Sequence, residues 1–163
     1  MPGPSAKPSI FISYAHEDQP EQAAADKVQW LSYVIGYLQP AVSQGVAVFG
    51  STTSFAAETP GTRRSNQACD VFILLVSRHA LASKYILDTE IAIIKERQKN
   101  REEVHCYPLL LTTTPSYALD PVRDWIIRPP NLRPFGSYPP DERDQHMLDA
   151  AEIQRARKLQ TFQ

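Results

Sequence analysis

Four short and almost continuous apolar runs constrain the fold of this chain more than any other feature. They occupy residues 10–12, 46–49, 71–76 and 104–111. Each run has the length of a strand and is rich in β-branched or aromatic side chains. Because the runs are continuous rather than alternating, they predict strands that are covered on both faces, which is typical of a parallel sheet.

Between the runs, apolar side chains recur at helical spacing. Residues 21–38 predict a helix that ends before Pro40, residues 83–99 predict the clearest helix, and residues 143–159 predict another in a polar background. Residues 50–70 lack this periodicity, which predicts a long functional loop. The alternation of strands and helices indicates an α/β fold with a mostly parallel sheet and right-handed crossovers.

The length of 163 residues suits one domain, whose core can form without disulfides or metals. Three of the 14 prolines lie in residues 1–8 and predict a flexible N-terminal arm. Eight prolines follow Tyr107, and they indicate either a linker that leaves the domain or loops that are folded on it. Cys69 and Cys106 lie beside or inside apolar runs, where a cysteine usually acts as a small apolar side chain.

The charge balance excludes some partners. The chain has 17 basic and 18 acidic side chains, and it has no run of lysines or arginines, so nucleic acid is not an expected partner. No apolar stretch approaches the ~20 residues that a membrane span needs, and residues 1–8 lack the apolar core of a signal peptide. We therefore expect a cytoplasmic protein that does not bind a membrane.

Ligands of open parallel sheets bind beyond the carboxyl ends of the strands, where the strand order reverses. In this chain that rule indicates Ser13, Tyr14, Ala15 and His16 after the first run and Ser77 after the third. The chain has only six glycines and no glycine-rich phosphate loop, which disfavours nucleotide binding through either standard loop. The four histidines lack the spacing of metal ligands, so no metal site is expected.

Glu90 occupies an unusual place on the helix expected over residues 83–99. A helical wheel with about 100° per residue puts it inside the apolar arc, between Ile86 and Ile94. A carboxylate there must be paired, neutral or facing a cavity, because burying a lone charge is expensive. One interpretation is a structural ion pair, with Arg97 as a candidate partner. The other is a catalytic carboxylate on a helix that opens on the ligand site.

Glu17 and Asp18 follow the first strand, as in the acidic pocket of response-regulator receivers. The third strand, however, ends in Ser77, where a receiver would have its phosphorylated aspartate. The sequence therefore does not support a receiver.

Four segments occur in the order found in one known family. They are residues 9–18 (Ser-Ile-Phe-Ile-Ser-Tyr-Ala-His-Glu-Asp), residues 70–77 (Asp-Val-Phe-Ile-Leu-Leu-Val-Ser), Ser83, Lys84 and Tyr85 followed by Glu90, and residues 130–135 (Pro-Asn-Leu-Arg-Pro-Phe). On these segments the chain resembles the Toll/interleukin receptor (TIR) domains in their bacterial form. The resemblance implies a flavodoxin-like three-layer fold with a mostly parallel sheet of about five strands. It implies a TIR domain over residues 9–160 with a closing helix over about 142–160, and it favours folded loops over a linker for the late prolines.

In TIR domains that are enzymes, a glutamate on the helix after the third strand supports cleavage of the N-glycosidic bond of NAD+. By position that residue is Glu90, whose carboxylate would hydrogen-bond the ribose hydroxyls and stabilise the oxocarbenium-like charge as nicotinamide leaves. The resemblance thus implies an NAD+ glycohydrolase that forms ADP-ribose or a cyclic isomer, with NAD+ as substrate and no cofactor. The substrate-binding residues it implies are Ser13, Tyr14, Ala15, His16, Phe49, Ser77, Ser83 and Tyr85.

The chain departs from the family in the loop after the second strand, where many bacterial members have an acidic residue and Gly-x-x-Trp. Here residues 50–55 read Gly-Ser-Thr-Thr-Ser-Phe, and the expected assembly residues are Phe55, Gly61, Arg63 and Arg64. In related enzymes this loop contacts a neighbouring subunit. We therefore expect activity to depend on self-association, with a sensor domain outside this chain in a bacterial immune protein.

The alternative is a non-catalytic TIR adaptor that acts only by associating with other TIR domains. Adaptors can keep the Ser13-Tyr14 opening, but they need not keep a carboxylate inside an apolar arc. Glu90 therefore favours the enzyme over the adaptor.

Overall fold

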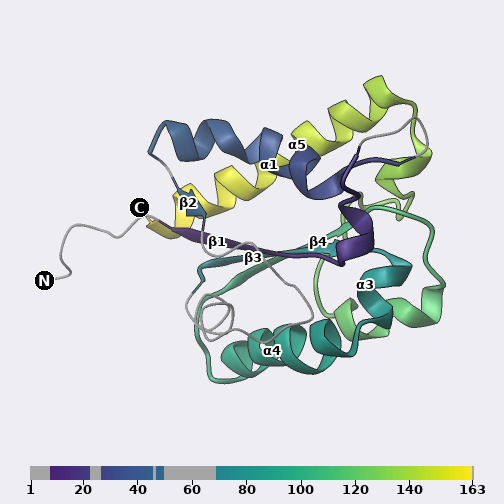
Figure 1. Ribbon diagram of the computed structural model, residues 1–163. Coiled ribbons are helices and arrows are strands. Elements are labelled where there is room, and N and C mark those ends of the chain that lie inside the picture. The colour runs from purple at the N-terminus through teal and green to yellow at the C-terminus, as the bar shows by residue number, and fades with distance from the viewer. Residues whose placement is uncertain (1–7, 23–26, 46, 50–68, 163) are drawn as a thin grey trace, which may run out of the picture.

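Four strands form a single sheet in which all neighbouring strands are parallel (Figure 1). They are β1 (Ser9–Ser13), β2 (Val48–Phe49), β3 (Val71–Val76) and β4 (His105–Leu110), in the order β2-β1-β3-β4. The computed structural model describes residues 8–22, 27–45, 47–49 and 69–162. The chain order reverses between β1 and β3, as it does in flavodoxin-like sheets. The prediction of a parallel α/β sheet is confirmed.

The sequence predicts a sheet of about five strands, whereas the part of the chain that the structure describes forms four. At the outer edge of β4, where a fifth strand would lie, Arg128 forms a single parallel bridge with Leu109. Leu110 N donates to Arg128 O at 2.8 Å, and Arg128 N donates to Pro108 O at 2.9 Å. Pro129 and Pro130 follow directly and have no N–H to donate, so a longer ladder cannot form there.

Helices cover both faces of the sheet and give three layers (Figure 1). One face carries α1 (Trp30–Ser43) and α5 (Pro140–Phe162), and the other carries α3 (Arg78–Ala82), η2 (Ile86–Ile91) and α4 (Ala92–Lys99). Shorter 3-10 segments are η1 (His16–Asp18), η3 (Ser116–Val122) and η4 (Phe135–Ser137). Side chains alternate along β1, so Ile12 packs in the core under α1 and α5, whereas Phe11 packs in the core under α3 and α4.

Helix α1 differs at both ends from the prediction of a helix over residues 21–38 that stops before Pro40. It begins at Trp30, because the preceding loop is held by the Gln29 side chain, whose Nε2 donates to Pro20 O at 2.9 Å. It continues past Pro40 to Ser43, at the cost of the one hydrogen bond that a proline cannot donate. Gly45, with φ of 76°, ends the helix in the left-handed conformation that glycine adopts easily.

Helix α5 lies in the region where the sequence predicts the closing helix. Tyr33 Oη on α1 donates to Asp144 Oδ1 at 2.6 Å, and the Arg143 guanidinium lies 4.9 Å from the centre of the Tyr33 ring. These contacts join α5 to α1. Within the described ranges no helix is long and apolar enough to cross a bilayer.

Gly136 provides a test of the packing between η4 and α1. A Cβ at this position would lie 2.9 Å from Leu111 O and 3.1 Å from a ring carbon of Trp30. We expect Gly136→Ala to lower the free energy of unfolding by about 1 to 3 kcal/mol, because backbone and a buried indole must move. Urea unfolding measures this change. Gly36→Ala is the matched control, since an added Cβ there meets nothing within 4 Å, and an equal loss in both variants would contradict the prediction.

Candidate functional site

Glu90 and Ser13 meet at the carboxyl end of β1, on the face of the sheet that α3 and α4 cover. Ser13 is the last residue of β1 and shares the orientation of Phe11, because side chains on a strand alternate. Its Oγ donates to Glu90 Oε2 at 2.5 Å. Both side chains are buried, with 0% and 1% of their residues' surface exposed for Ser13 and Glu90, respectively. The carboxylate thus lies at the edge where β1 and β3 end, beside the reversal of strand order.

Burial raises the pKa of the Glu90 carboxyl to about 7, and the hydroxyl of Ser13 opposes the shift by donating to the charged form. A carboxyl that titrates near neutral pH is partly charged and partly protonated under ordinary conditions. This property is common for groups that accept a proton or stabilise a developing positive charge.

The helix that carries Glu90 is not the continuous α-helix predicted over residues 83–99. Residues Ile86–Ile91 form a π-helical segment, and α-helical geometry resumes over Ala92–Lys99. Single-turn π segments occur frequently at functional sites. The prediction that Glu90 lies among apolar side chains is confirmed, since Ile86, Ile91 and Ile94 are buried in the same layer. The π segment is a feature that the periodicity of the sequence did not reveal.

The candidate ion-pair partner of Glu90 makes other contacts. The Nε of Arg97 lies 3.4 Å from Glu102 Oε1, and its Nη1 donates to Cys69 Sγ at 3.6 Å. Desolvation raises the pKa of Glu90, and the hydrogen bond from the Ser13 hydroxyl opposes the rise. The hydrogen bond that the structure gives to the Glu90 carboxylate comes from Ser13, and the role of Glu90 stays a prediction.

Asp18 is a second buried carboxylate at the same edge of the sheet. Its Oδ2 accepts from Ser77 Oγ at 2.5 Å, and only 5% of Asp18 is exposed. Burial raises its pKa, and the Ser77 hydroxyl, His79 and Arg78 oppose the rise. The sequence analysis named Asp18 in a receiver-like pocket and at the end of the first TIR-like segment, but not as a site residue. An acidic residue directly after the first strand, at the reversal of strand order, was the signal that could have identified it.

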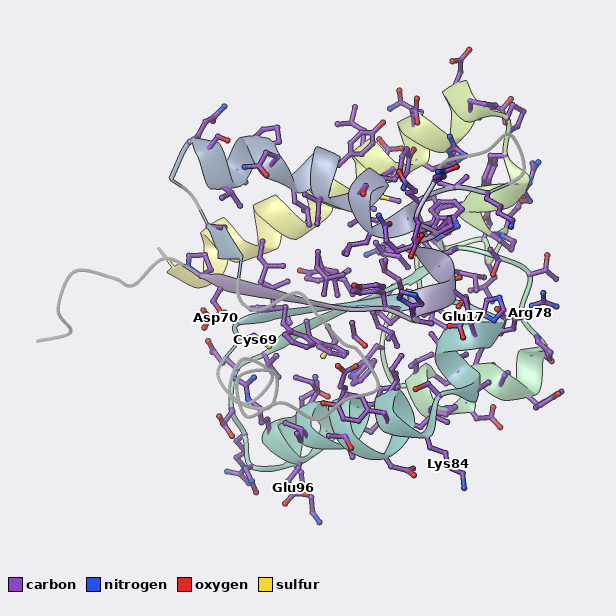
Figure 2. The ribbon with its side chains drawn as sticks, in the orientation of Figure 1. Glu17, Cys69, Asp70, Arg78, Lys84 and Glu96 are labelled. Atoms are coloured by element: carbon purple, nitrogen blue, oxygen red, sulfur yellow. The ribbon has the colours of Figure 1, made fainter. Side chains whose placement is uncertain are left out.

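Figure 2 shows the carboxyl ends of the strands, where Glu17 and Arg78 lie. Cys69 and Asp70 lie at the other end of the strands, where β3 begins. His16 lies on the η1 turn and is exposed. Glu17, Arg78 and His79 are near enough to Asp18 to act on its pKa.

The other predicted substrate-binding residues do not gather around Glu90 as one set. Tyr14 packs in the core on the α1 and α5 face, whereas Ala15 packs in the core on the opposite face. Ser83 accepts from Ile86 N at 3.2 Å through its Oγ and thus caps the helix that carries Glu90. Tyr85 precedes η2, half-buried, with its hydroxyl oxygen buried.

Some of the predicted residues fall outside the described part of the chain. The backbone of Phe49 pairs with Ile10 in the sheet, but its side chain is not described. The expected assembly residues Phe55, Gly61, Arg63 and Arg64 lie outside the described residues. Their roles stay predictions.

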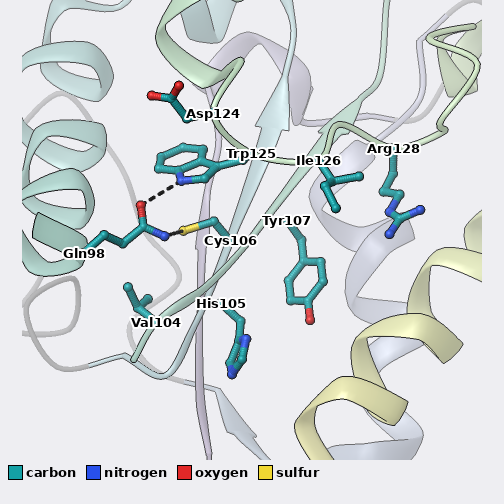
Figure 3. Close-up of a pocket in the computed structure, with 9 residues that line it drawn as sticks. All are labelled: Gln98, Val104, His105, Cys106, Tyr107, Asp124, Trp125, Ile126 and Arg128. Carbon is teal, nitrogen blue, oxygen red and sulfur yellow. Dashed lines mark hydrogen bonds between the residues drawn. The ribbon is translucent and has the colours of Figure 1, made fainter. Parts of the chain in front are cut away.

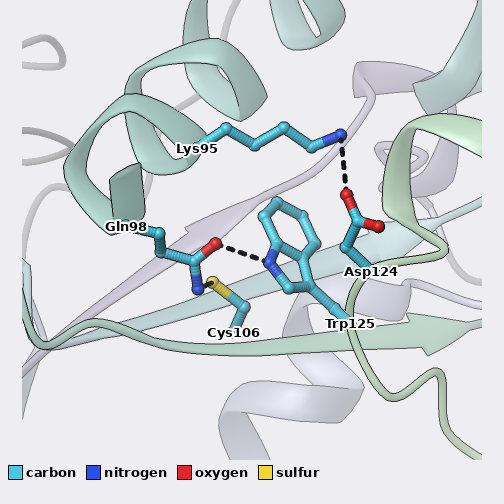
Figure 4. A network of polar contacts seen from close by, with 5 residues as sticks. All are labelled: Lys95, Gln98, Cys106, Asp124 and Trp125. Atoms are coloured by element: carbon cyan, nitrogen blue, oxygen red, sulfur yellow. Dashed lines mark hydrogen bonds and ion pairs between the residues drawn. The ribbon is translucent and has the colours of Figure 1, made fainter. Parts of the chain in front are cut away.

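A pocket of about 210 Å³ lies elsewhere, against the outer edge of β4 (Figure 3). Its lining includes Gln98, Cys106 and Trp125 but neither of the two carboxylates. The Trp125 indole N–H donates to Gln98 Oε1 at 2.8 Å, and Gln98 Nε2 donates to Cys106 Sγ at 3.4 Å (Figure 4). Burial raises the pKa of the Cys106 thiol to about 12, so this thiol stays protonated and is a poor nucleophile.

Lys95 completes this network by lying 3.8 Å from Asp124 Oδ2 and 5.8 Å from the centre of the Trp125 ring (Figure 4). These contacts join α4 to the segment after η3 and to β4. Among the residues that the structure describes, no three His, Cys, Asp or Glu side chains gather into a metal-binding group.

No protein-family model matches this chain, and no curated protein matches it. Among solved structures it is similar to a structure described as the activated Roq1 resistosome directly recognizing the pathogen effector XopQ (TIR domains). The identity is 13%, the TM-score is 0.47, and the match covers 90% of this chain and 85% of the other. At these values the likeness does not establish a family for this chain.

Proposed function

We propose that this chain is a TIR domain that cleaves the bond between nicotinamide and ribose in NAD+. The observation that carries the proposal is the buried Glu90 carboxyl, which accepts a hydrogen bond from Ser13 where β1 ends and has a pKa of about 7. By the resemblance of the four sequence segments to TIR domains, the glutamate that supports catalysis in that family corresponds to this residue.

In the proposed reaction, Glu90 acts in its charged form. The ribose hydroxyls of NAD+ donate to the carboxylate, whose negative charge stabilises the oxocarbenium-like ribose as nicotinamide leaves. Ser13 holds the carboxylate in place through its hydroxyl. Water then attacks the ribose carbon that nicotinamide has left and gives ADP-ribose, or a nucleophile within the substrate attacks the same carbon and gives a cyclic isomer.

The burial of Glu90 bears on how this reaction is regulated. With only 1% of the residue exposed, a ligand reaches the carboxylate only after the atoms that cover it move aside. Because the site is covered, we expect the domain to be weakly active alone. Association between TIR domains, as expected for the effector module of an immune protein, would favour the open site by mass action.

The proposed function is tested by the pH dependence of nicotinamide release. With the protein concentrated by a crowding agent, kcat/KM for NAD+ should rise with pH and reach half its maximum near pH 7, because the charged carboxylate is the active form. Ser13→Ala should move the midpoint upward, because the variant loses a hydrogen bond that lowers the pKa of Glu90.

The pH range of about 5.5 to 8.5 lies on either side of the expected midpoint of ~7. A kcat/KM that does not change over this range would contradict the role of Glu90. Absence of nicotinamide release at every protein concentration would favour the adaptor, whose activity is association alone. Light scattering on the same samples shows whether association took place.

A further inference from the structure

The η1 turn is tied to the helical layers on both faces of the sheet. On one side, Asp18 Oδ2 accepts from Ser77 Oγ at 2.5 Å, and the same oxygen of Ser77 accepts from Ala80 N at 3.0 Å at the start of α3. On the other side, Gln19 Nε2 donates to Ser32 Oγ at 2.7 Å, and Gln19 Oε1 accepts from Ser32 N at 3.2 Å on α1. The turn that directly follows β1 is therefore anchored at two consecutive residues.

Asp18 is the unusual anchor. It is buried, whereas its neighbours His16 and Glu17 on the same turn are exposed. Burial of a carboxylate is costly, and the proposed chemistry at Glu90 makes no use of Asp18. The bond from Ser77 joins residues that are 59 positions apart in the chain and connects the end of β1 to the end of β3.

We propose that Asp18 is a positioning residue of the NAD+ site, whose hydrogen bond with Ser77 fixes the η1 turn and thereby holds His16 at the substrate. The inference rests on the proposed function. The η1 turn begins three residues after Ser13, whose hydroxyl contacts Glu90. Because the proposed bond cleavage uses no group from η1, loss of the anchor affects substrate binding and leaves the chemical step largely unchanged.

The experiment compares NAD+ binding by calorimetry in a Glu90→Gln background, where substrate is bound but not consumed. We expect Asp18→Ala to raise Kd five- to tenfold, which corresponds to the net contribution of about one ordinary hydrogen bond. Asp18→Asn should restore Kd to within twofold of the parent, because the amide oxygen still accepts from Ser77. Glu17→Ala is the matched control, since it removes one negative charge from the same turn and leaves the anchor intact.

Turnover and hydrogen exchange separate positioning from general damage. With Glu90 intact, Asp18→Ala should raise KM and change kcat less than twofold, and the amides of residues 16–18 should exchange faster while those of β3 do not. If Asp18→Ala does not fold, Ser77→Ala breaks the same bond from the donor side and takes its place.

Each outcome is decisive. A Kd for Asp18→Ala equal to that of Glu17→Ala would overturn the inference while Glu90-dependent cleavage of NAD+ stands. Failure of the parent to bind NAD+, together with no release of nicotinamide by the wild type, would overturn both the inference and the proposed function. A fall in kcat at unchanged KM would also overturn positioning, because it would place Asp18 in the chemical step.

Discussion

Glu90→Gln is expected to lower the rate of nicotinamide release at least about 100-fold at pH 8. The variant keeps the shape of the side chain and an oxygen that can accept from Ser13, but it removes the negative charge. A single preorganised group that stabilises charge in the transition state is worth about this much in rate. The measurement is the initial rate of nicotinamide formation from NAD+ by chromatography, with the protein concentrated by a crowding agent.

Asp88→Asn provides the control for that comparison. Asp88 lies on the same π-helical segment as Glu90, but it is exposed. Its replacement makes the same chemical change two residues away, and we expect a rate within twofold of the wild type. Equal rates for Glu90→Gln and the wild type would end the assignment of Glu90 as the catalytic residue.

The second large effect of Glu90→Gln is on stability, which we expect the substitution to raise although it lowers the rate. The pKa of Glu90 is raised from 4.5 to about 7 in the fold, so the folded protein binds this proton more tightly than the unfolded chain. The folded state therefore loses stability as pH rises from the pKa of the unfolded chain through the pKa of the folded protein. The full pKa shift corresponds to a loss of about 3 kcal/mol in the free energy of unfolding. Glu90→Gln carries no such cost.

We therefore expect Glu90→Gln to be more stable than the wild type at pH 8, and its advantage should exceed that at pH 5 by about 2 kcal/mol. Urea unfolding at the two pH values measures the difference. Asp88→Asn should show no comparable change with pH, because Asp88 is exposed. A variant whose advantage is the same at both pH values would show that Glu90 is not the source of the linkage. A buried acid that costs stability is typical of a functional site.

Most of the fold could be predicted because its signals are local. The continuous apolar runs that became β1, β3 and β4 gave the parallel sheet, and the wheel over residues 83–99 put Glu90 in the core. The errors arose where local signals conflict with packing. Pro40 suggested a helix end that the last turn of α1 passes, and Pro129 shortened the fifth strand to one bridge.

The sequence by itself determined the layers of this protein and the burial of one carboxylate, because apolar periodicity acts over a few residues and needs no knowledge of distant partners. Only the tertiary structure decided which hydroxyl each acid contacts. Ser13 and Glu90 are 77 positions apart, and Asp18 and Ser77 are 59 apart. Their meeting depends on the register of β1 against β3 and on the π-helical turn at Glu90, and a non-local register is fixed only when the two cores pack around the sheet.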